Sequence, residues 1–358
     1  MASKILFYGG QPGGTYGWGV CNRHLIDELA KLTTVVPLTE ADPRWNSPAL
    51  PGDLFAQLGN HEFIPVTPAR GERNFAYTFF ETEPNRRSVE NAKRFDVLFA
   101  GSTWCVERMK AHGIPHGVVL VQGVDGRVFY PQPPARTDGK FRIFSGGKFE
   151  LRKGQDLVLR AFKVLQRKYP DMILVTAWFN HWPKLMTLMA KAPDLRFELI
   201  AGSWVEQMEH VYRLNGIDPG RVITLPLTPQ AQMAEVYRES DLGLFPNRCE
   251  GGTNLVLMEY MACGRPAVAT DGTGHRDVIN EKNALPLRLL RDLTINGPDK
   301  TPAARWVEPT VDEIIAQVEF AYRHRTTAAA LGRQAAADMK GWTWERAART
   351  ILAHTGAA

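Results

Sequence analysis

The stretch FPNRCEGGTNLVLMEYMACGRPAVATDGTGHRDVI, residues 245–279, contains the end of a buried strand, a glycine turn and a helix in immediate succession. The strand is expected to end at Pro246, and Thr253 or Asn254 can cap the helix that follows. This helix is expected to run to Cys263, because a glycine and a proline come shortly after it. A buried strand that leads through a turn into a helix is the repeating unit of a parallel sheet covered on both faces.

The same alternation occurs on both sides of a proline-rich stretch, residues 129–140, which is typical of a linker. Before it, we expect strands at 4–8, 33–38, 61–66, 74–80, 96–100 and 117–122, and helices at 20–32, at 85–94 and from 102. After it, we expect strands at 141–147, 172–178, 196–202, 221–227 and 241–246, and helices at 155–168, after a Ser203–Glu206 capping box and after Thr228 and Pro229. The end of the chain reads as helical, with a second capping box from Thr310 to Glu313.

This pattern predicts an α/β protein with two doubly wound, Rossmann-like domains that face each other across a cleft. The expected domains are residues 1–132 and 133–340, with a helix at 341–358 that packs back on the first domain. Sheets of this kind bind ligands at the carboxyl ends of their strands. The cleft between the domains is therefore the expected site.

The composition excludes several classes of protein. The 358 residues are 44% hydrophobic and 23% charged, which rules out a disordered or fibrous chain. No apolar stretch approaches the roughly 20 residues needed to cross a bilayer, and the start lacks the long apolar region of a signal peptide. A cytoplasmic protein is the expectation. The net charge of +5 is not by itself a signature of nucleic-acid binding.

The four cysteines, Cys21, Cys105, Cys249 and Cys263, are far apart in the sequence. No pair of them has the spacing of a zinc site, so buried free thiols are expected, and no protein-bound metal.

Two turns that suit an anion occupy corresponding positions in the two halves. The first is GGQPGGTYGWGV, residues 9–20, where the amides of Gly13 and Gly14 can approach a phosphate, although the spacing is not G-x-G-x-x-G. The second is FSGGKFELRKGQD, residues 144–156, where Lys148 and Lys153 flank the turn. Taken alone, each turn also has a non-functional interpretation: the first is then an ordinary strained turn, and the second a solvated basic turn. Together, they favour a diphosphate in the cleft.

Two glutamates border the helix of the opening stretch. Glu250 precedes it and Glu259 lies about two turns into it, so both can reach a ligand at the helix start. A carboxylate that accepts two hydroxyl groups is suited to holding a ribose, whereas a lone glutamate on an amphipathic helix is more commonly exposed.

Four segments together resemble the retaining glycosyltransferases of family four, which have the GT-B fold. They are the glycines at 9–14, VQGVDGRVFYPQ at 121–132, GGKFELRKGQDLVLRAF at 146–162 and EGGTNLVLMEYMACGRPAVATD at 250–271. The resemblance covers nearly the whole chain. It departs from the family at one place: the family has seven residues between its two donor-site glutamates, and here eight lie between Glu250 and Glu259, as if one residue were inserted in the turn at 251–253.

The resemblance implies a role for each matching residue. Lys148 and Lys153 would bind the diphosphate, with the amides of Gly13 and Gly14 over the phosphates. Glu259 would hold the ribose, and Glu250 would touch the donor sugar unless the extra residue displaces it. At the helix start, Thr253 and the amides of Asn254 and Leu255 complete the donor site. Many relatives have a histidine after the strand at 74–80; this chain has FFETEPN there, and Glu81 is the nearest polar candidate.

The resulting expectation is an enzyme that transfers a hexosyl or pentosyl group from a UDP- or GDP-sugar to the hydroxyl of a glycan or a lipid-linked sugar. Retention of configuration rests on the resemblance alone. No metal is needed if the lysines stabilise the leaving diphosphate, and the chain has no Asp-x-Asp motif. Backbone near 202–204 and 225–228 is the expected nucleobase pocket.

Other readings stay open. The basic residues Arg70, Arg73, Arg86, Arg87, Lys93 and Arg94 fit a solvated face, or else contact with an anionic acceptor or a membrane surface. A modified base in DNA as acceptor is permitted but not favoured. A binding protein for nucleotide sugars without catalysis is a further alternative, and a nucleotide-dependent oxidoreductase is disfavoured by the glycine spacing.

Overall fold

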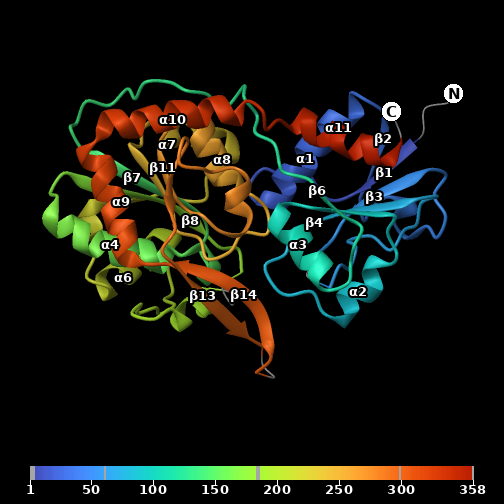
Figure 1. The fold of residues 1–358 in the computed structure, drawn as a ribbon, viewed down its shortest axis with the longest axis horizontal. Helices are drawn as coiled ribbons and strands as arrows, with labels where there is room; N and C mark the ends of the chain where they lie inside the picture. The colour runs from blue at the N-terminus through green and yellow to red at the C-terminus, as the bar shows by residue number, and fades with distance from the viewer. Residues whose placement is uncertain (1–4, 60–61, 183–185, 298–299, 357–358) are drawn as a thin grey trace.

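Two parallel six-stranded sheets form the body of the protein and lie beside each other with helices around them (Figure 1). The computed structural model describes residues 5–59, 62–182, 186–297 and 300–356. The first sheet has the strand order β2-β1-β3-β4-β5-β6, and the second has the order β12-β11-β10-β7-β8-β9. The winding direction reverses between β1 and β3 and between β7 and β10, and ligands bind beside such reversals in sheets of this type.

The first sheet consists of short strands joined by helices. Its elements are β1 (Ile5–Gly9), α1 (Gly17–Ala30), β2 (Thr34–Leu38), β3 (Asp53–Gln57), β4 (Asn74–Thr78), α2 (Arg86–Ala92), β5 (Val97–Ala100), α3 (Thr103–Ala111) and β6 (Gly117–Val119). The predicted strands at 33–38, 74–80, 96–100 and 117–122 are confirmed with shifted ends, as is the one at 4–8 over the residues described, since Lys4 lies outside them. The three predicted helices are also present, and Asn85 and Ser102 cap α2 and α3.

The second sheet repeats this pattern after the irregular segment at 129–140. Its elements are β7 (Phe141–Lys148), α4 (Gln155–Lys168), β8 (Met172–Phe179), α6 (Trp204–Leu214), β9 (Val222–Thr224), α7 (Met233–Arg238), β10 (Leu242–Phe245), α8 (Leu255–Ala262), β11 (Ala267–Thr270) and β12 (Leu285–Leu287). The capping box of Ser203 and Glu206 is confirmed at the start of α6. Thr228 does not cap a helix: its hydroxyl donates to the carbonyl of Pro226, and α7 begins five residues later.

Two predicted strands are wrong, for the same reason. At 62–66 the chain makes only an isolated bridge between Leu58 and Pro65, and His61 lies outside the described residues. The place beside β1 and β4 is taken by β3, which the sequence analysis missed. The segment 196–202 is irregular, because β9 occupies the place beside β8. An apolar run with no strand beside it stays a loop.

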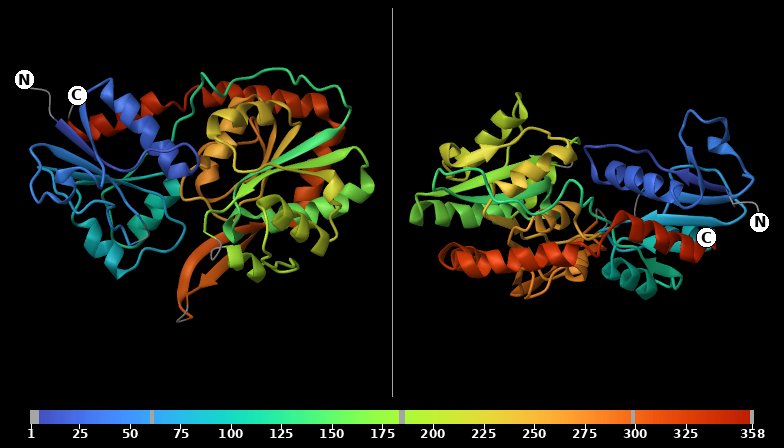
Figure 2. Two further views of the ribbon diagram at one scale, coloured as in Figure 1. Left: turned by 180° about the vertical axis from the view of Figure 1, so that it is seen from behind. Right: turned by 90° about the horizontal axis from the view of Figure 1, so that it is seen from above.

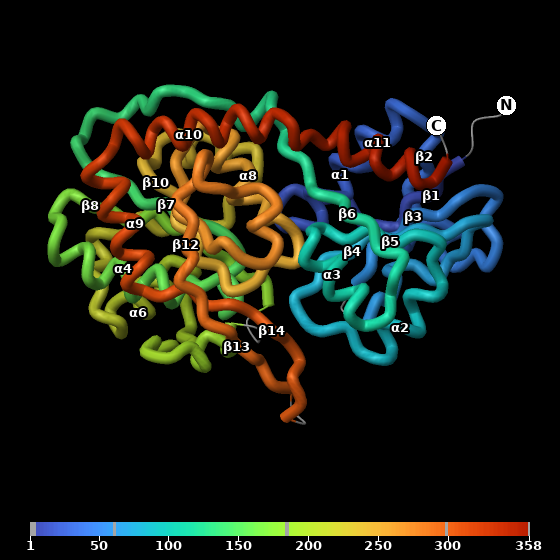
Figure 3. Tube along the Cα trace, in the orientation of Figure 1, coloured from blue at the N-terminus to red at the C-terminus, as the bar shows by residue number. Residues whose placement is uncertain are grey.

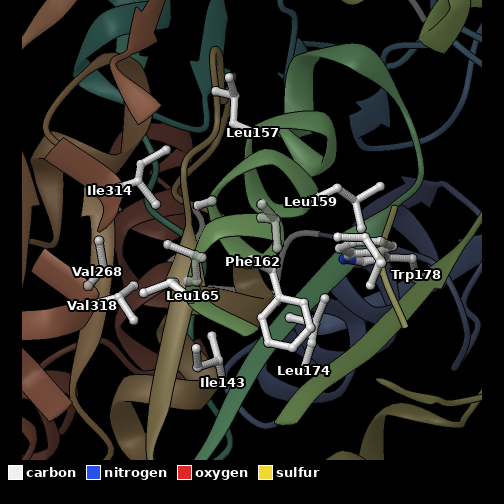
Figure 4. Close-up of a cluster of buried hydrophobic side chains, with 14 of the residues drawn as sticks. Ile143, Leu157, Leu159, Phe162, Leu165, Leu174, Trp178, Val268, Ile314 and Val318 are labelled. Carbon is white, nitrogen blue, oxygen red and sulfur yellow. The ribbon is translucent and has the colours of Figure 1, made fainter. Parts of the chain in front are cut away.

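Helix α4 shows how the second half of the protein, which is built on the second sheet, is held together. Its apolar face packs on the sheet, while α9 (Val311–Arg323) covers the same core from another side (Figure 4). Burying one large apolar side chain stabilises a fold by roughly 1.5–3 kcal/mol. The residues of this cluster shown in Figure 4 include Ile143, Leu157, Phe162, Leu165, Leu174, Trp178, Ile314 and Val318.

The last two helices carry the chain from the second half back to the first (Figure 2). Helix α10 (Arg325–Met339) packs against α8, and α11 (Trp344–Thr355) packs on α1. The rings of Trp344 and His24 stack with centroids 5.0 Å apart, and Ile351 is fully buried in the core of the first half. Thr310 caps α9 through the amide of Glu313, but Glu313 does not complete the expected capping box, since its carboxylate accepts from the amides at 288 and 289.

A two-stranded antiparallel hairpin projects from the second half beside the first (Figures 1 and 3). It consists of β13 (Leu290–Asn296) and β14 (Pro302–Pro309), and the sequence analysis did not expect it. The indole of Trp306 donates to the carbonyl of Glu81 at 2.6 Å, and the amide of Glu83 donates to the carbonyl of Ala303 at 2.8 Å. The hairpin therefore holds the loop that follows β4.

Candidate functional site

A cavity of about 370 Å³ lies between the two halves and is lined by residues from both. The first half contributes the turn at 14–18 together with Val20, Phe79, Glu81 and Gln122. The second half contributes the turns after β7, β8 and β9 and the start of α8. The cavity thus lies where the carboxyl ends of strands from both sheets meet, as the fold pattern predicts.

A compact group of ion pairs forms one wall of this cavity. The Lys153 ammonium lies 2.6 Å from Glu250 Oε1, and Arg152 Nη1 lies 3.2 Å from Glu250 Oε2. Asn247 donates a further hydrogen bond to the same carboxylate. Burial disfavours the charged carboxylate, but Lys153 and Arg152 outweigh burial and lower the pKa of Glu250 to about 2. Glu250 is therefore a buried, ionised group within reach of a ligand.

The other charged groups of this wall are also paired. Arg152, a residue that the sequence analysis missed, lies 3.5 Å from Glu81 and 2.7 Å from Glu150. Lys148 lies 3.1 Å from Glu150, and its ammonium sits 4.7 Å from the centre of the exposed ring of Trp182. A diphosphate that enters must therefore compete with carboxylates for these cations.

The start of α8 opens onto the cavity. Asn254 precedes the helix with φ +62°, a left-handed conformation, and its side chain lies 3.2 Å from His275 Nε2 instead of capping the helix. The hydroxyl of Thr253 donates to the sulfur of Met258, so Thr253 does not cap it either, which corrects the expectation. The first amides of a helix have no partner within the helix. Leu255 and Val256 line the cavity, which gives their end of the helix access to an anion.

The glycine turn at 251–253, where the sequence analysis expected an extra residue, is closely packed. Ser102 donates to the carbonyl of Gly251 at 2.8 Å across the two halves. A Cβ at Gly251 would lie 2.4 Å from the carbonyl oxygen of Phe80, and one at Gly274 would lie 1.7 Å from that of Gly252. The turn therefore packs tightly against the first half, while Glu250 still faces the cavity.

Glu259 also lines the cavity and is buried. Its carboxyl accepts from the side-chain amide of Gln230 and from the hydroxyl of Tyr237, the latter at 3.3 Å. Burial raises the pKa of Glu259 to about 8, although both hydrogen bonds act in the other direction. Gln230 also receives a hydrogen bond from Arg23 of α1 at 2.9 Å, so it connects the two halves at this point.

The structure brings together most, but not all, of the predicted site residues. Those that line the cavity are Gly14, Glu81, Lys148, Lys153, Glu250, Asn254, Leu255 and Glu259. Gly13 and Thr253 are not among the lining residues, and the Gly13 amide already donates to the carbonyl of Gly19 at 2.9 Å. Of the expected nucleobase loops, 226–228 lines the cavity, whereas 202–204 does not, because Trp204 packs on Phe149 and Phe179.

Sequence reasoning missed several lining residues. Arg152 lies beside Lys153 in one turn already singled out, and Tyr16 and Trp18 lie in the other, so their neighbours could have indicated them. Gln230 and Trp182 lie in no motif that the sequence analysis recognised. All four cysteines are buried and free, as expected.

The basic residues of the first half are partly paired. Arg73 lies 2.6 Å from Asp53, and Lys93 lies 3.2 Å from Glu90.

Among the described residues, no three His, Cys, Asp or Glu side chains are grouped so that they could hold a metal ion. Over the same part of the chain, every helix is too short or too polar to span a membrane.

The two facing sheets with a cavity between them define the class of fold, which is GT-B. HepE of Anabaena, solved with UDP-glucose, superposes with a TM-score of 0.66 over 99% of this chain and 100% of that one, at 13% identity. Sucrose-phosphate synthase of Thermosynechococcus elongatus superposes with a TM-score of 0.63 over 97% and 96%, at 14% identity. The fold predicted from the sequence is confirmed.

Residues 140–292 match the family model described as "Glycosyl transferases group 1", which covers the second sheet. The D-inositol 3-phosphate glycosyltransferase of Frankia alni is 28% identical over 244 residues, 65% of this chain and 51% of that protein. A GDP-mannose-dependent alpha-(1-6)-phosphatidylinositol monomannoside mannosyltransferase of Mycolicibacterium smegmatis is 29% identical over 174 residues, 45% and 40% of the two chains. This chain spans about half the length of the curated relatives that it matches, or less.

Proposed function

We propose that this protein is a glycosyltransferase that moves a sugar from a nucleoside-diphosphate sugar to an acceptor hydroxyl in the cavity between its halves. The observation that carries the proposal is the convergence of Lys148, Arg152, Lys153 and the start of α8 on one wall. The group 1 match and the glycosyltransferase names of the relatives support it. The UDP-glucose bound by HepE and the GDP-mannose of the mannosyltransferase's name support a UDP- or GDP-sugar as donor.

In the reaction, the bond between the anomeric carbon and the diphosphate oxygen breaks, and a bond to the acceptor oxygen forms. Negative charge grows on the leaving diphosphate, and Lys148 and Lys153 stabilise that charge more strongly in the transition state than in the bound donor. The amides at the start of α8 add to this effect. Because three cations line this wall, the proposed reaction needs no metal ion.

Two carboxyl groups complete the donor site. Glu250 is ionised and accepts hydrogen bonds from sugar hydroxyls, and Glu259 accepts from the ribose once Gln230 is displaced. We propose, from the resemblance to family four, that the configuration is retained. The acceptor hydroxyl then approaches from the face that the diphosphate leaves, and its proton passes to the departing phosphate oxygen.

A thermal-shift panel of UDP, GDP, ADP and their common sugars tests binding, and release of free sugar from the stabilising donor tests catalysis. We expect one nucleoside diphosphate to raise the melting temperature of the protein. We also expect the corresponding donor sugar to be hydrolysed slowly when no acceptor is present. A nucleotide that stabilises the protein while neither donor hydrolysis nor transfer to any acceptor is detected would indicate a binding protein. No stabilisation by any nucleotide would contradict the proposal.

A further inference from the structure

The two walls of the cavity differ in charge. Its lysine and arginine residues, Lys148, Arg152 and Lys153, all belong to the second half. Within the described residues, the lining side chains of the first half include no lysine, arginine or histidine; Arg23 of α1 does not line the cavity and donates to Gln230. A donor diphosphate held by the cationic wall leaves the other wall for the acceptor.

The wall of the first half is aromatic. The rings of Trp18 and Phe79 lie 4.4 Å apart, and Tyr77 supports both from the core, with ring centroids at 5.8 and 4.7 Å. Tyr16 stands at the mouth with 39% of its surface exposed. Aromatic faces of this kind pack against apolar ring faces, while the indole and phenol edges bond hydroxyl groups.

The charged group that this wall adds, among its described lining residues, is acidic. Glu81 lines the cavity with its side chain 27% exposed, and its neighbour of opposite charge is Arg152, which also contacts Glu150 and Glu250. The hairpin holds Glu81 in place through the hydrogen bond from Trp306. A phosphate on the acceptor would approach this carboxylate, and the described first-half residues that line the cavity include no lysine, arginine or histidine to offset the repulsion.

We infer that the acceptor is an uncharged, hydroxylated ring, a sugar or cyclitol, and not a phosphorylated one. The inference rests on the proposed function. It separates this chain from relatives such as that of Frankia alni, whose name specifies D-inositol 3-phosphate. The basis is the first-half wall of this chain, whose described lining residues offer aromatic faces and a carboxylate but no lysine, arginine or histidine for a phosphate.

Matched pairs of ligands test the inference. The 358-residue protein is first saturated with the nucleoside diphosphate that stabilises it most. It is then titrated with myo-inositol against inositol 3-phosphate, methyl mannoside against mannose 6-phosphate and methyl glucoside against glucose 6-phosphate. We expect every neutral member that binds to have at least a tenfold lower Kd than its phosphorylated partner. A phosphorylated member that binds as tightly or more tightly would overturn the inference, as would a panel with no neutral ligand bound.

Two matched variants identify the cause of the preference. Glu81→Gln removes the carboxylate and should narrow the ratio of the two Kd values at least threefold. Glu83→Gln is the control, because Glu83 does not line the cavity and pairs with Arg108 at 3.5 Å. Equal narrowing in both variants, or none in Glu81→Gln, would contradict the role given to Glu81. The readout is acceptor binding, so failure of the proposed function is seen separately, as absence of nucleotide binding or of donor hydrolysis. If no nucleotide stabilises the protein, the same ligand pairs are titrated into the nucleotide-free protein. The inference is then judged by the same Kd ratios.

Discussion

The Lys153 ammonium and the Glu250 carboxylate lie 2.6 Å apart, with only 10% and 6% of their side chains exposed. Breaking such a pair by removing one partner leaves a buried charge uncompensated, which is costly. A diphosphate can take over Lys153 because Glu250 keeps Arg152 and Asn247 as partners. The pair therefore holds Lys153 ready in the cavity without isolating Glu250 when the ligand arrives.

Replacing Lys153 by alanine should lower kcat about 100-fold, comparable to the loss of one preorganised donor to a developing charge. Steady-state kinetics with the identified donor measures this change. Lys163→Ala is the control, since Lys163 is exposed on α4 and does not line the cavity. An unchanged kcat in Lys153→Ala would remove this lysine from the mechanism.

Glu259 should make stability fall as pH rises. Burial raises its pKa from 4.5 to about 8, so the folded protein binds a proton that the unfolded chain releases above pH 4.5. This contribution is complete below pH 4.5 and is lost as pH rises through 8. Each pKa unit corresponds to about 1.4 kcal/mol. Urea unfolding at several pH values should show this slope in the wild type and its absence in Glu259→Gln; parallel curves would contradict the assignment.

His275 should make stability rise with pH, in contrast to Glu259, and should do so at lower pH. Burial lowers its pKa from 6.5 to about 4, and Lys153 acts the same way, although Glu250 opposes the shift. The unfolded chain therefore binds a proton that the folded protein lacks between pH 4 and 6.5, and stability rises with pH across this window. We expect His275→Gln to flatten the rise, as measured by urea unfolding. His324→Gln, at an exposed site, should follow the wild type. The same flattening in both variants would assign the effect to another group.

Much of the fold was predictable because most strands are buried along their length. The four residues of β10 are all buried, and such apolar runs between helical patterns leave few alternatives. The hairpin was not predictable in this way, since four of the seven residues of β13 are charged or polar and exposed, and each of its strands has the other as its only sheet partner among the described residues. The segment 196–202 was wrongly predicted as a strand because of its apolar residues. Phe197 packs on the core from a loop, so its apolar character reflects burial and not strand formation.

The candidate site was predictable where its residues are close in sequence. Lys148 and Lys153 flank one turn, so their convergence followed from the local pattern. The pairing of Arg152 with Glu81 joins residues from opposite halves, and no local spacing reveals it. Gly13 and Thr253 do not line the cavity, and the partners of their polar groups, Gly19 and Met258, are apparent only in the folded chain.

Gly154 offers a test of how the fold positions Lys153. It has φ +71°, and a Cβ there would lie 2.2 Å from the carbonyl oxygen of Pro246 at the end of β10. The left-handed conformation costs a non-glycine residue roughly 1–2 kcal/mol, and the clash with backbone adds to that cost. Gly154→Ala should therefore lower the free energy of unfolding by more than about 2 kcal/mol.

The matched control for Gly154→Ala is Gly113→Ala. Gly113 has φ +79° but open space around the new Cβ, so only the conformational cost applies, roughly 1–2 kcal/mol. Urea unfolding compares the two variants. Because Gly154 directly follows Lys153, its replacement should also weaken nucleotide binding, whereas Gly113→Ala should not. Equal losses of stability in both variants, with nucleotide binding intact, would show that the contact with Pro246 does not position the lysine.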